Sequence, residues 1–153
     1  MERQEQALCY FCEGYNCAQA VFMAYCDLFG MNISQGKALC AGMGTGMGGL
    51  REKCGAVSSM FLLVGLATES STNPTLEKRQ LYSFIRHLNQ TFEEKMGSSC
   101  CQTLLKNVKD LVTQNPSEQN EKYYQKRPCA LFVKTASDII EAQLLPILND
   151  NRE

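Results

Sequence analysis

Apolar residues recur every three or four positions along most of the chain, the spacing that places them on one face of an α-helix. The clearest case is the segment 75–96, in which Leu81, Phe84, Leu88 and Phe92 follow this spacing. No segment alternates between apolar and polar residues in the way that is typical of a half-buried β-strand. The pattern therefore predicts an all-α protein.

Residues that favour the beginnings and ends of helices divide this pattern into separate segments. Asn16, Ser34 and Asn73 stand where a helix would be capped, and Gly30 and Gly97 stand where one would end in a left-handed residue. The predicted helices span about residues 2–13, 17–29, 34–41, 54–68, 75–96, 100–111 and 129–145. We expect a bundle of six or seven helices with short connections.

Length and composition indicate one ordinary globular unit. With 153 residues, of which 44% are hydrophobic, we expect a single domain over residues 1–153 with its cysteine-containing core at about residues 10–141. A net charge of −1 offers no basic surface for nucleic acid or an anionic membrane. The longest apolar stretch is too short to span a bilayer, and the N-terminus is too polar for a secretory signal. We therefore expect a cytoplasmic protein, and exposed apolar helix faces would favour a homodimer.

Cysteine is the unusual feature of the composition. The nine cysteines are Cys9, Cys12, Cys17, Cys26, Cys40, Cys54, Cys100, Cys101 and Cys129. An odd number of cysteines in a chain without a secretory signal argues against a framework of structural disulfides. Redox chemistry, metal binding and simple packing remain, and the presence of one histidine excludes a histidine-rich metal site.

A glycine-rich stretch leads directly into one of these cysteines. Five of the eleven glycines lie between Gly42 and Gly49, shortly before Cys54. Such a run predicts a loop in which the backbone approaches another group closely or adopts positive φ. The apolar segment that follows predicts a helix, so that the Cys54 thiol would lie at a helix N-terminus, where the thiolate is favoured. Arg51 and Lys53 would add positive potential there.

Other cysteines stand in the same relation to a predicted helix. Cys17 follows the Asn16 cap, Cys100 and Cys101 follow a serine pair, and Cys129 follows a proline that suits a helix start. Because a bundle can bring several helix N-termini to one end, we expect these thiols to lie close together with lowered pKa values. The alternative is that the cysteines only fill the core. We favour that simpler interpretation for the remaining four, Cys9, Cys12, Cys26 and Cys40.

These segments, taken in order, resemble a known family. They are Gly14-Tyr-Asn-Cys17-Ala-Gln-Ala-Val21, the glycine loop with Cys54-Gly-Ala56, Gly97-Ser-Ser-Cys100-Cys101, and Cys129 before an apolar helix. From about Tyr10 to Glu141 the chain resembles the C-GCAxxG-C-C family, small helical bacterial proteins to which redox activity is ascribed. The resemblance implies four characteristic cysteines: Cys17, Cys54, one of Cys100 and Cys101, and Cys129. Ser59 stands where the family has a glycine, which would loosen the packing or add a hydroxyl.

Thiol–disulfide chemistry is the first functional hypothesis. Two acidic cysteines on adjacent helix ends would cycle between dithiol and disulfide, one attacking and one resolving. We prefer Cys17 and Cys54 as this pair, with Cys129 and either Cys100 or Cys101 as a second pair. The protein would then be a thiol–disulfide oxidoreductase that works with an unidentified redox partner.

Metal binding is the alternative. Cys17, Cys54, Cys100 (or Cys101) and Cys129 would bind zinc or an iron–sulfur cluster through four thiolates. Ligands so distant in sequence lack the local CxxC pair of most zinc sites. The backbone amides of the glycine loop would then hold the cofactor, and the candidate positions are Gly44, Gly46, Gly48, Gly49 and Gly55.

Overall fold

The computed structural model describes residues 1–69, 77–113 and 128–150. The chain is 81% helical and its described part contains no strand, so the all-α prediction is confirmed. The described residues hold eight helices rather than six or seven, not counting the irregular turn α4 treated below. They are α1 (Arg3–Cys12), α2 (Cys17–Tyr25), α3 (Ile33–Leu39), α5 (Gly55–Glu69), α6 (Leu81–Met96), α7 (Cys101–Thr113), α9 (Cys129–Ile139) and α10 (Leu145–Asp150). None of the described helices is both long and apolar enough to span a membrane.

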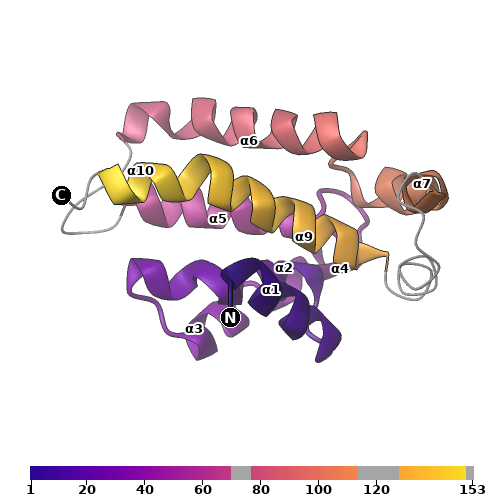
Figure 1. Ribbon diagram of the computed structural model, residues 1–153, viewed down its shortest axis with the longest axis horizontal. Coiled ribbons are helices and arrows are strands. Elements are labelled where there is room, and N and C mark those ends of the chain that lie inside the picture. The colour runs from indigo at the N-terminus through magenta and orange to yellow at the C-terminus, as the bar shows by residue number, and fades with distance from the viewer. Residues whose placement is uncertain (70–76, 114–127, 151–153) are drawn as a thin grey trace.

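The helices form three layers (Figure 1). Helix α6 is one outer layer, α5 and the α9–α10 segment form the middle layer, and α1, α2 and α3 form the other outer layer. Helix α2 packs against α5, α1 and α9, and every one of its residues except Gln19 is buried. A helix that is apolar on all sides belongs in the interior, which explains this central position. Helix α6 is amphipathic instead, and it buries Leu88 and Phe92 against α5 and α9.

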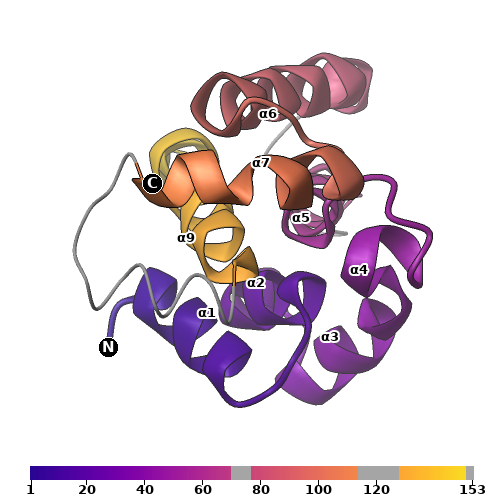
Figure 2. The ribbon, with the colours of Figure 1, turned by 90° about the vertical axis from the view of Figure 1, so that its right-hand side faces the viewer.

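Helix α7 lies across one end of the bundle (Figure 2). Its start is tied to the start of α5 by a short antiparallel contact between two loops, centred on the isolated bridge between Lys53 and Cys100. The Cys54 N–H donates to the Ser99 carbonyl at 2.8 Å, and the Cys101 N–H donates to the Glu52 carbonyl. These bonds bring the N-terminal ends of α5 and α7 together, and with them Cys54 and Cys101.

Several predicted boundaries are correct and others are not. The helix predicted over residues 17–29 ends at Tyr25 and is followed by a 3₁₀ turn, η1 (Cys26–Phe29). Asn16 caps α2 through a reciprocal hydrogen-bond pair with Gln19, as its position indicated. The cap of α3 is Asn32 rather than Ser34, because Asn32 makes the same reciprocal pair with Gln35. Helix α6 begins later than predicted, after the 3₁₀ turn η3 (Lys78–Gln80), while the predicted cap Asn73 lies outside the described residues.

The last predicted helix is divided by a change of helical type. A π-helical turn, η4 (Ile140–Leu144), separates α9 from α10 and accounts for the extra helix. Pro146 follows this turn; it has no N–H, and its ring would collide with the carbonyl four residues earlier in a regular α-helix. The wider turn explains how the chain continues past Pro146.

Candidate thiol site

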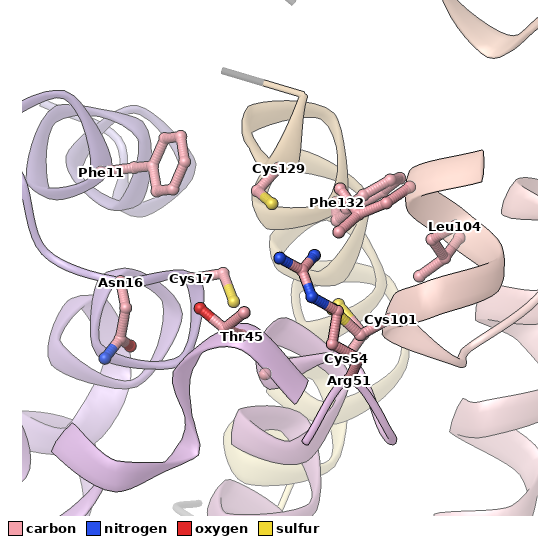
Figure 3. A pocket seen from close by; sticks show the side chains of 12 residues that line it. Phe11, Asn16, Cys17, Thr45, Arg51, Cys54, Cys101, Leu104, Cys129 and Phe132 are labelled. Atoms are coloured by element: carbon pink, nitrogen blue, oxygen red, sulfur yellow. The ribbon is translucent and has the colours of Figure 1, made fainter. Parts of the chain in front are cut away.

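Four cysteines line one pocket of about 280 Å³ (Figure 3). Each comes from the N-terminal end of a different helix: Cys17 begins α2, Cys54 directly precedes α5, Cys101 begins α7 and Cys129 begins α9. The sequence therefore correctly indicated that helix N-termini would gather at one end of the bundle. The apolar walls of the pocket are formed by Phe11, Leu104, Leu105 and Phe132.

Hydrogen-bond donors surround the Cys17 sulfur. The Cys54 thiol donates to it, and so do the backbone N–H groups of Thr45, Gly55 and Ala56. Hydrogen bonds to a thiolate favour the charged form, whereas burial opposes it. The donors prevail, and the pKa of Cys17 falls from its ordinary value of 9.0 to about 6 although only 7% of the residue is exposed.

A glycine allows this sulfur to reach the start of α5. A Cβ atom at position 55 would lie 2.7 Å from the Cys17 Sγ and 2.9 Å from the Met43 carbonyl oxygen, both closer than real Cβ contacts. Gly55 therefore leaves the space in which the sulfur contacts the free amides of the first turn of α5. The acidic thiol is thus stabilised by the N-terminus of a neighbouring helix rather than by that of its own helix.

Cys54 is a hydrogen-bond donor, which corrects the expectation that it is the thiolate. It stands at the cap position of α5, where its carbonyl accepts the Ser58 N–H at 3.0 Å. The hydrogen bond to Cys17, burial and the nearby negative charge of Cys17 raise the pKa of Cys54 well above its ordinary value. Cys54 therefore stays protonated while Cys17 is ionised.

Burial also outweighs the helix dipole at the other two pocket cysteines. It raises the pKa of Cys101, and it raises the pKa of Cys129 to about 12 with a further contribution from the charge of Cys17. The prediction that a helix N-terminus lowers the pKa of every one of these thiols is thus wrong for Cys54, Cys101 and Cys129. The reason is that a low-dielectric environment disfavours the charged form.

The structure distinguishes between the two adjacent cysteines. Cys101 lines the pocket, whereas Cys100 lies outside it and donates from its thiol to the Arg51 carbonyl at 3.6 Å. The backbone and hydroxyl of Thr103, together with the charge of Lys53, lower the pKa of the Cys100 thiol. The pocket position of the adjacent pair is therefore Cys101.

The cysteines outside the predicted set have different environments. Cys26 and Cys40 are fully buried in the hydrophobic core, and burial raises the pKa of both thiols. Both properties agree with a packing role. Cys9 is half-buried and Cys12 is exposed. None of these four lines the pocket.

The glycine loop adopts positive φ as predicted, and its left-handed turn extends to two residues with side chains, Thr45 and Met47, which the sequence did not indicate. The element labelled α4 (Gly44–Met47) has positive φ at Thr45 (53°), Gly46 (64°) and Met47 (74°), and Gly48 continues it at 59°. Each side-chain-bearing residue in this conformation costs about 1–2 kcal/mol. Hydrogen bonds from the Arg51 N–H to the Thr45 carbonyl and from the Glu52 N–H to the Gly46 carbonyl hold the turn. Its result is that the Thr45 N–H faces the Cys17 sulfur.

The loop glycines mainly allow protein atoms to approach one another. A Cβ at Gly44 would lie 2.6 Å from the Asn16 side chain, and one at Gly46 would lie 2.7 Å from the Cys101 Cβ. Gly48 and Gly49 have φ values of 59° and 83°. Of the five glycines predicted to hold a cofactor, Gly55 alone lines the pocket. The cofactor role stays a prediction that this geometry does not favour.

The arrangement also bears on the metal alternative. Within residues 1–69, 77–113 and 128–150, no three side chains of Cys, His, Asp or Glu converge closely enough to hold a metal ion. Cys100, one member of the predicted four-thiolate set, lies outside the pocket. The four pocket cysteines therefore do not form a ready tetrahedral site of the kind zinc prefers.

The two basic residues before Cys54 have separate roles. The Lys53 ammonium donates to Asn89 Oδ1 at 3.0 Å and to Ser99 Oγ at 2.7 Å, so it ties the start of α5 to α6 and to the loop before α7. The Arg51 guanidinium points into the space between Cys17, Cys129 and Phe132 (Figure 3). The Arg51 backbone adopts positive φ (59°).

Comparison with known proteins decides the family. A family model described as "Putative redox-active protein (C_GCAxxG_C_C)" matches residues 15–143, most of the chain. The chain belongs to this family. No curated protein and no solved structure matches it.

The departure at Ser59 has a clear structural result. Ser59 is fully buried, and its hydroxyl donates to the Ala18 carbonyl of α2 at 2.6 Å. Of the two outcomes expected for this substitution, the added hydroxyl is the one present. It joins α5 to α2 one residue after Cys17.

Proposed function

We propose that this protein carries out thiol–disulfide exchange, with Cys17 as the attacking thiol and Cys54 as the resolving thiol. The observation that supports this assignment is the hydrogen bond between a buried thiolate and a protonated thiol in one pocket. An attacking thiol is most effective when its pKa lies near the ambient pH, since it is then ionised and still nucleophilic. A Cys17 pKa of about 6 meets this condition at neutral pH.

The exchange takes place in two steps. The Cys17 thiolate attacks one sulfur of a disulfide substrate, which forms a mixed disulfide at Cys17 and releases the other half of the substrate as a thiolate. Cys54 then gives its proton to solvent or to the departing group and attacks the Cys17 sulfur. The products are a Cys17–Cys54 disulfide and a second substrate thiol, so two electrons pass to the substrate. A dithiol redox partner reduces the pair again by the reverse sequence.

Cys101 and Cys129 are assigned a secondary role. Both are thiols at neutral pH because burial raises their pKa values. They line the same pocket, so they are available to take over the disulfide once the first pair is oxidised. In a reducing compartment such as the cytoplasm, a partner dithiol would keep both pairs reduced.

The test uses the C12S, C100S background, which lacks the exposed thiol of Cys12 and the partly buried thiol of Cys100, whose pKa is lowered. One equivalent of an organic disulfide is added to the reduced protein, and the products are mapped by peptide mass spectrometry. We expect a Cys17–Cys54 disulfide in the background protein, a stable mixed disulfide at Cys17 when Cys54→Ser is added, and no fast reaction when Cys17→Ser is added. A product that joins Cys101 to Cys129 while Cys17 remains free would overturn the assignment.

A further inference from the structure

We propose that the substrate is a small organic disulfide that carries a carboxylate, and that Arg51 binds this carboxylate. The inference rests on the exchange function proposed above and specifies its substrate class. The juxtaposition that supports it is a guanidinium beside a buried thiolate in a pocket with apolar walls (Figure 3).

Burial of the reacting sulfurs favours a small molecule over a protein substrate. Cys17 is 7% exposed and Cys54 is 3% exposed, and both sulfurs are reached through the pocket. A disulfide held within a folded protein cannot approach these sulfurs without a rearrangement of the helix ends around them. A free organic disulfide can enter a pocket of about 280 Å³ with one half of its structure.

The lining of the pocket resembles that of small-molecule sites. Such sites are mostly apolar and have a few polar groups that fix the orientation of the ligand. Here Phe11 from α1, Leu104 and Leu105 from α7 and Phe132 from α9 supply the apolar surface. These walls suit the hydrocarbon or aromatic body of the ligand rather than its charged group.

Arg51 supplies the charged group of the pocket. None of the ion pairs among the described residues involves Arg51. Arg51 is an exposed residue, so its guanidinium is solvated in the free protein and is open to an anion that enters the pocket. The main stabilising contacts of the Cys17 thiolate come from Cys54 and three backbone amides, so this thiolate does not need the guanidinium. An anionic group of the ligand is therefore the natural partner, and a carboxylate accepts two parallel hydrogen bonds from arginine.

The backbone around Arg51 supports a positioning role. Its φ of 59° is unusual for a residue with a side chain. Hydrogen bonds from the Gln102 N–H and the Cys100 thiol to the Arg51 carbonyl hold this conformation. Strained residues that the surrounding structure holds in place are typical of ligand-binding sites.

The experiment compares two aromatic disulfides that release a coloured thiol when attacked. One is dithiobis(nitrobenzoate), with a carboxylate on each ring, and the other is dithiodipyridine, which is neutral at pH 8. Rates at Cys17 are measured in the C12S, C100S background for the parent and for Arg51→Gln, Arg51→Lys and the control Arg86→Gln, an exposed arginine on α6. The ratio of the two rates cancels any change in the reactivity of the Cys17 thiolate itself.

We expect Arg51→Gln to lower the preference for the carboxylate probe by roughly tenfold, the factor for one charge-assisted contact. Arg51→Lys should restore part of the preference, Arg86→Gln should leave it unchanged, and added salt should weaken it in the parent. If Arg51→Gln slows both probes equally, the carboxylate inference is refuted while exchange at Cys17 stands. If Cys17→Ser retains the fast reaction, the proposed function itself fails.

Discussion

Replacement of Cys54 tests the origin of the acidity of Cys17. The pKa of Cys17 falls from 9.0 to about 6, a difference of about three pKa units that corresponds to about 4 kcal/mol at about 1.36 kcal/mol per unit. The Cys54 thiol makes the largest of four hydrogen-bond contributions to this difference. Because a hydrogen bond to a charged group contributes about 1.5–3 kcal/mol, Cys54→Ala should raise the pKa of Cys17 by roughly one to two units.

A hydroxyl at the same position separates hydrogen bonding from disulfide formation. In Cys54→Ser the hydroxyl still donates, so the pKa of Cys17 should stay within about half a unit of the parent value although no disulfide can form. In Cys54→Ala, the thiolate fraction of Cys17 at pH 7 should fall from about nine-tenths to between about a half and a tenth. Cys101→Ala, which empties another position of the pocket, is the control and should leave the pKa nearly unchanged.

The assay is the rate at which iodoacetamide alkylates Cys17, followed by mass spectrometry of its peptide from about pH 4 to about pH 10. The midpoint of the rate profile gives the pKa and does not depend on how accessible the sulfur is. Coincident midpoints for the parent and Cys54→Ala would show that the Cys54 thiol does not stabilise the thiolate. The assignment of Cys54 as donor would then be wrong.

Two further predictions concern packing and one concerns pH. Gly55→Ala should lower the free energy of unfolding by about 1–3 kcal/mol and slow alkylation of Cys17, because the new Cβ would lie 2.7 Å from the Cys17 sulfur. The matched control is Gly65→Ala on the same helix, where the new Cβ would have no neighbouring atom within 4 Å. Alanine there should raise the free energy of unfolding by about 0.5–1 kcal/mol. Ser59→Ala should lower the free energy of unfolding by about 1 kcal/mol, since it removes the hydrogen bond to Ala18; an unchanged denaturation midpoint would contradict this. Under reducing conditions, stability should rise from about pH 6 to about pH 9 because the unfolded chain binds the proton that folded Cys17 has lost. The stability should fall above about pH 9, because Cys54 and Cys129 ionise in the unfolded chain while the fold keeps them protonated. The rise between about pH 6 and about pH 9 should be absent in Cys17→Ser.

Local signals in the sequence were enough to find most of the helices and to indicate that cysteines at their starts would gather. The Asn16 cap, the glycine run and Pro128 mark helix starts, and the cysteine after each of them lies at the pocket. These signals are reliable because they depend on a few neighbouring residues, through capping hydrogen bonds and backbone restrictions. Ser34 shows the limit of the method, since Asn32 competes for the same role and makes the better reciprocal pair.

The protonation states could not be predicted in this way. Each of the four cysteines stands at a helix start, so local reasoning treats them alike. Their pKa values diverge because Cys17 lies against the amides of α5, whereas the buried Cys101 and the partly buried Cys129 lack comparable donors. That difference depends on tertiary contacts and on the space left by Gly55. Positive φ was predicted for the glycine run, but its extension to Thr45 and Met47 was not, because these residues carry no signal for positive φ.

The charge of the reduced site also contributes to its reduction potential. Ionisation of Cys17 stabilises the reduced state, because the amides of Thr45, Gly55 and Ala56 donate to the thiolate. A disulfide carries no such charge, so the oxidised state loses this stabilisation. At pH 7, lowering the pKa of a thiol from 9.0 to about 6 stabilises the reduced state by the equivalent of roughly one pKa unit, a little over about 1 kcal/mol. For a two-electron couple this raises the potential by about 30 mV, a small part of the roughly 150 mV that separates the reducing thioredoxin from the oxidising DsbA. If the proposed exchange takes place, the acidity of Cys17 would speed its attack on a disulfide, and the direction of electron flow would depend on the substrate and the redox partner.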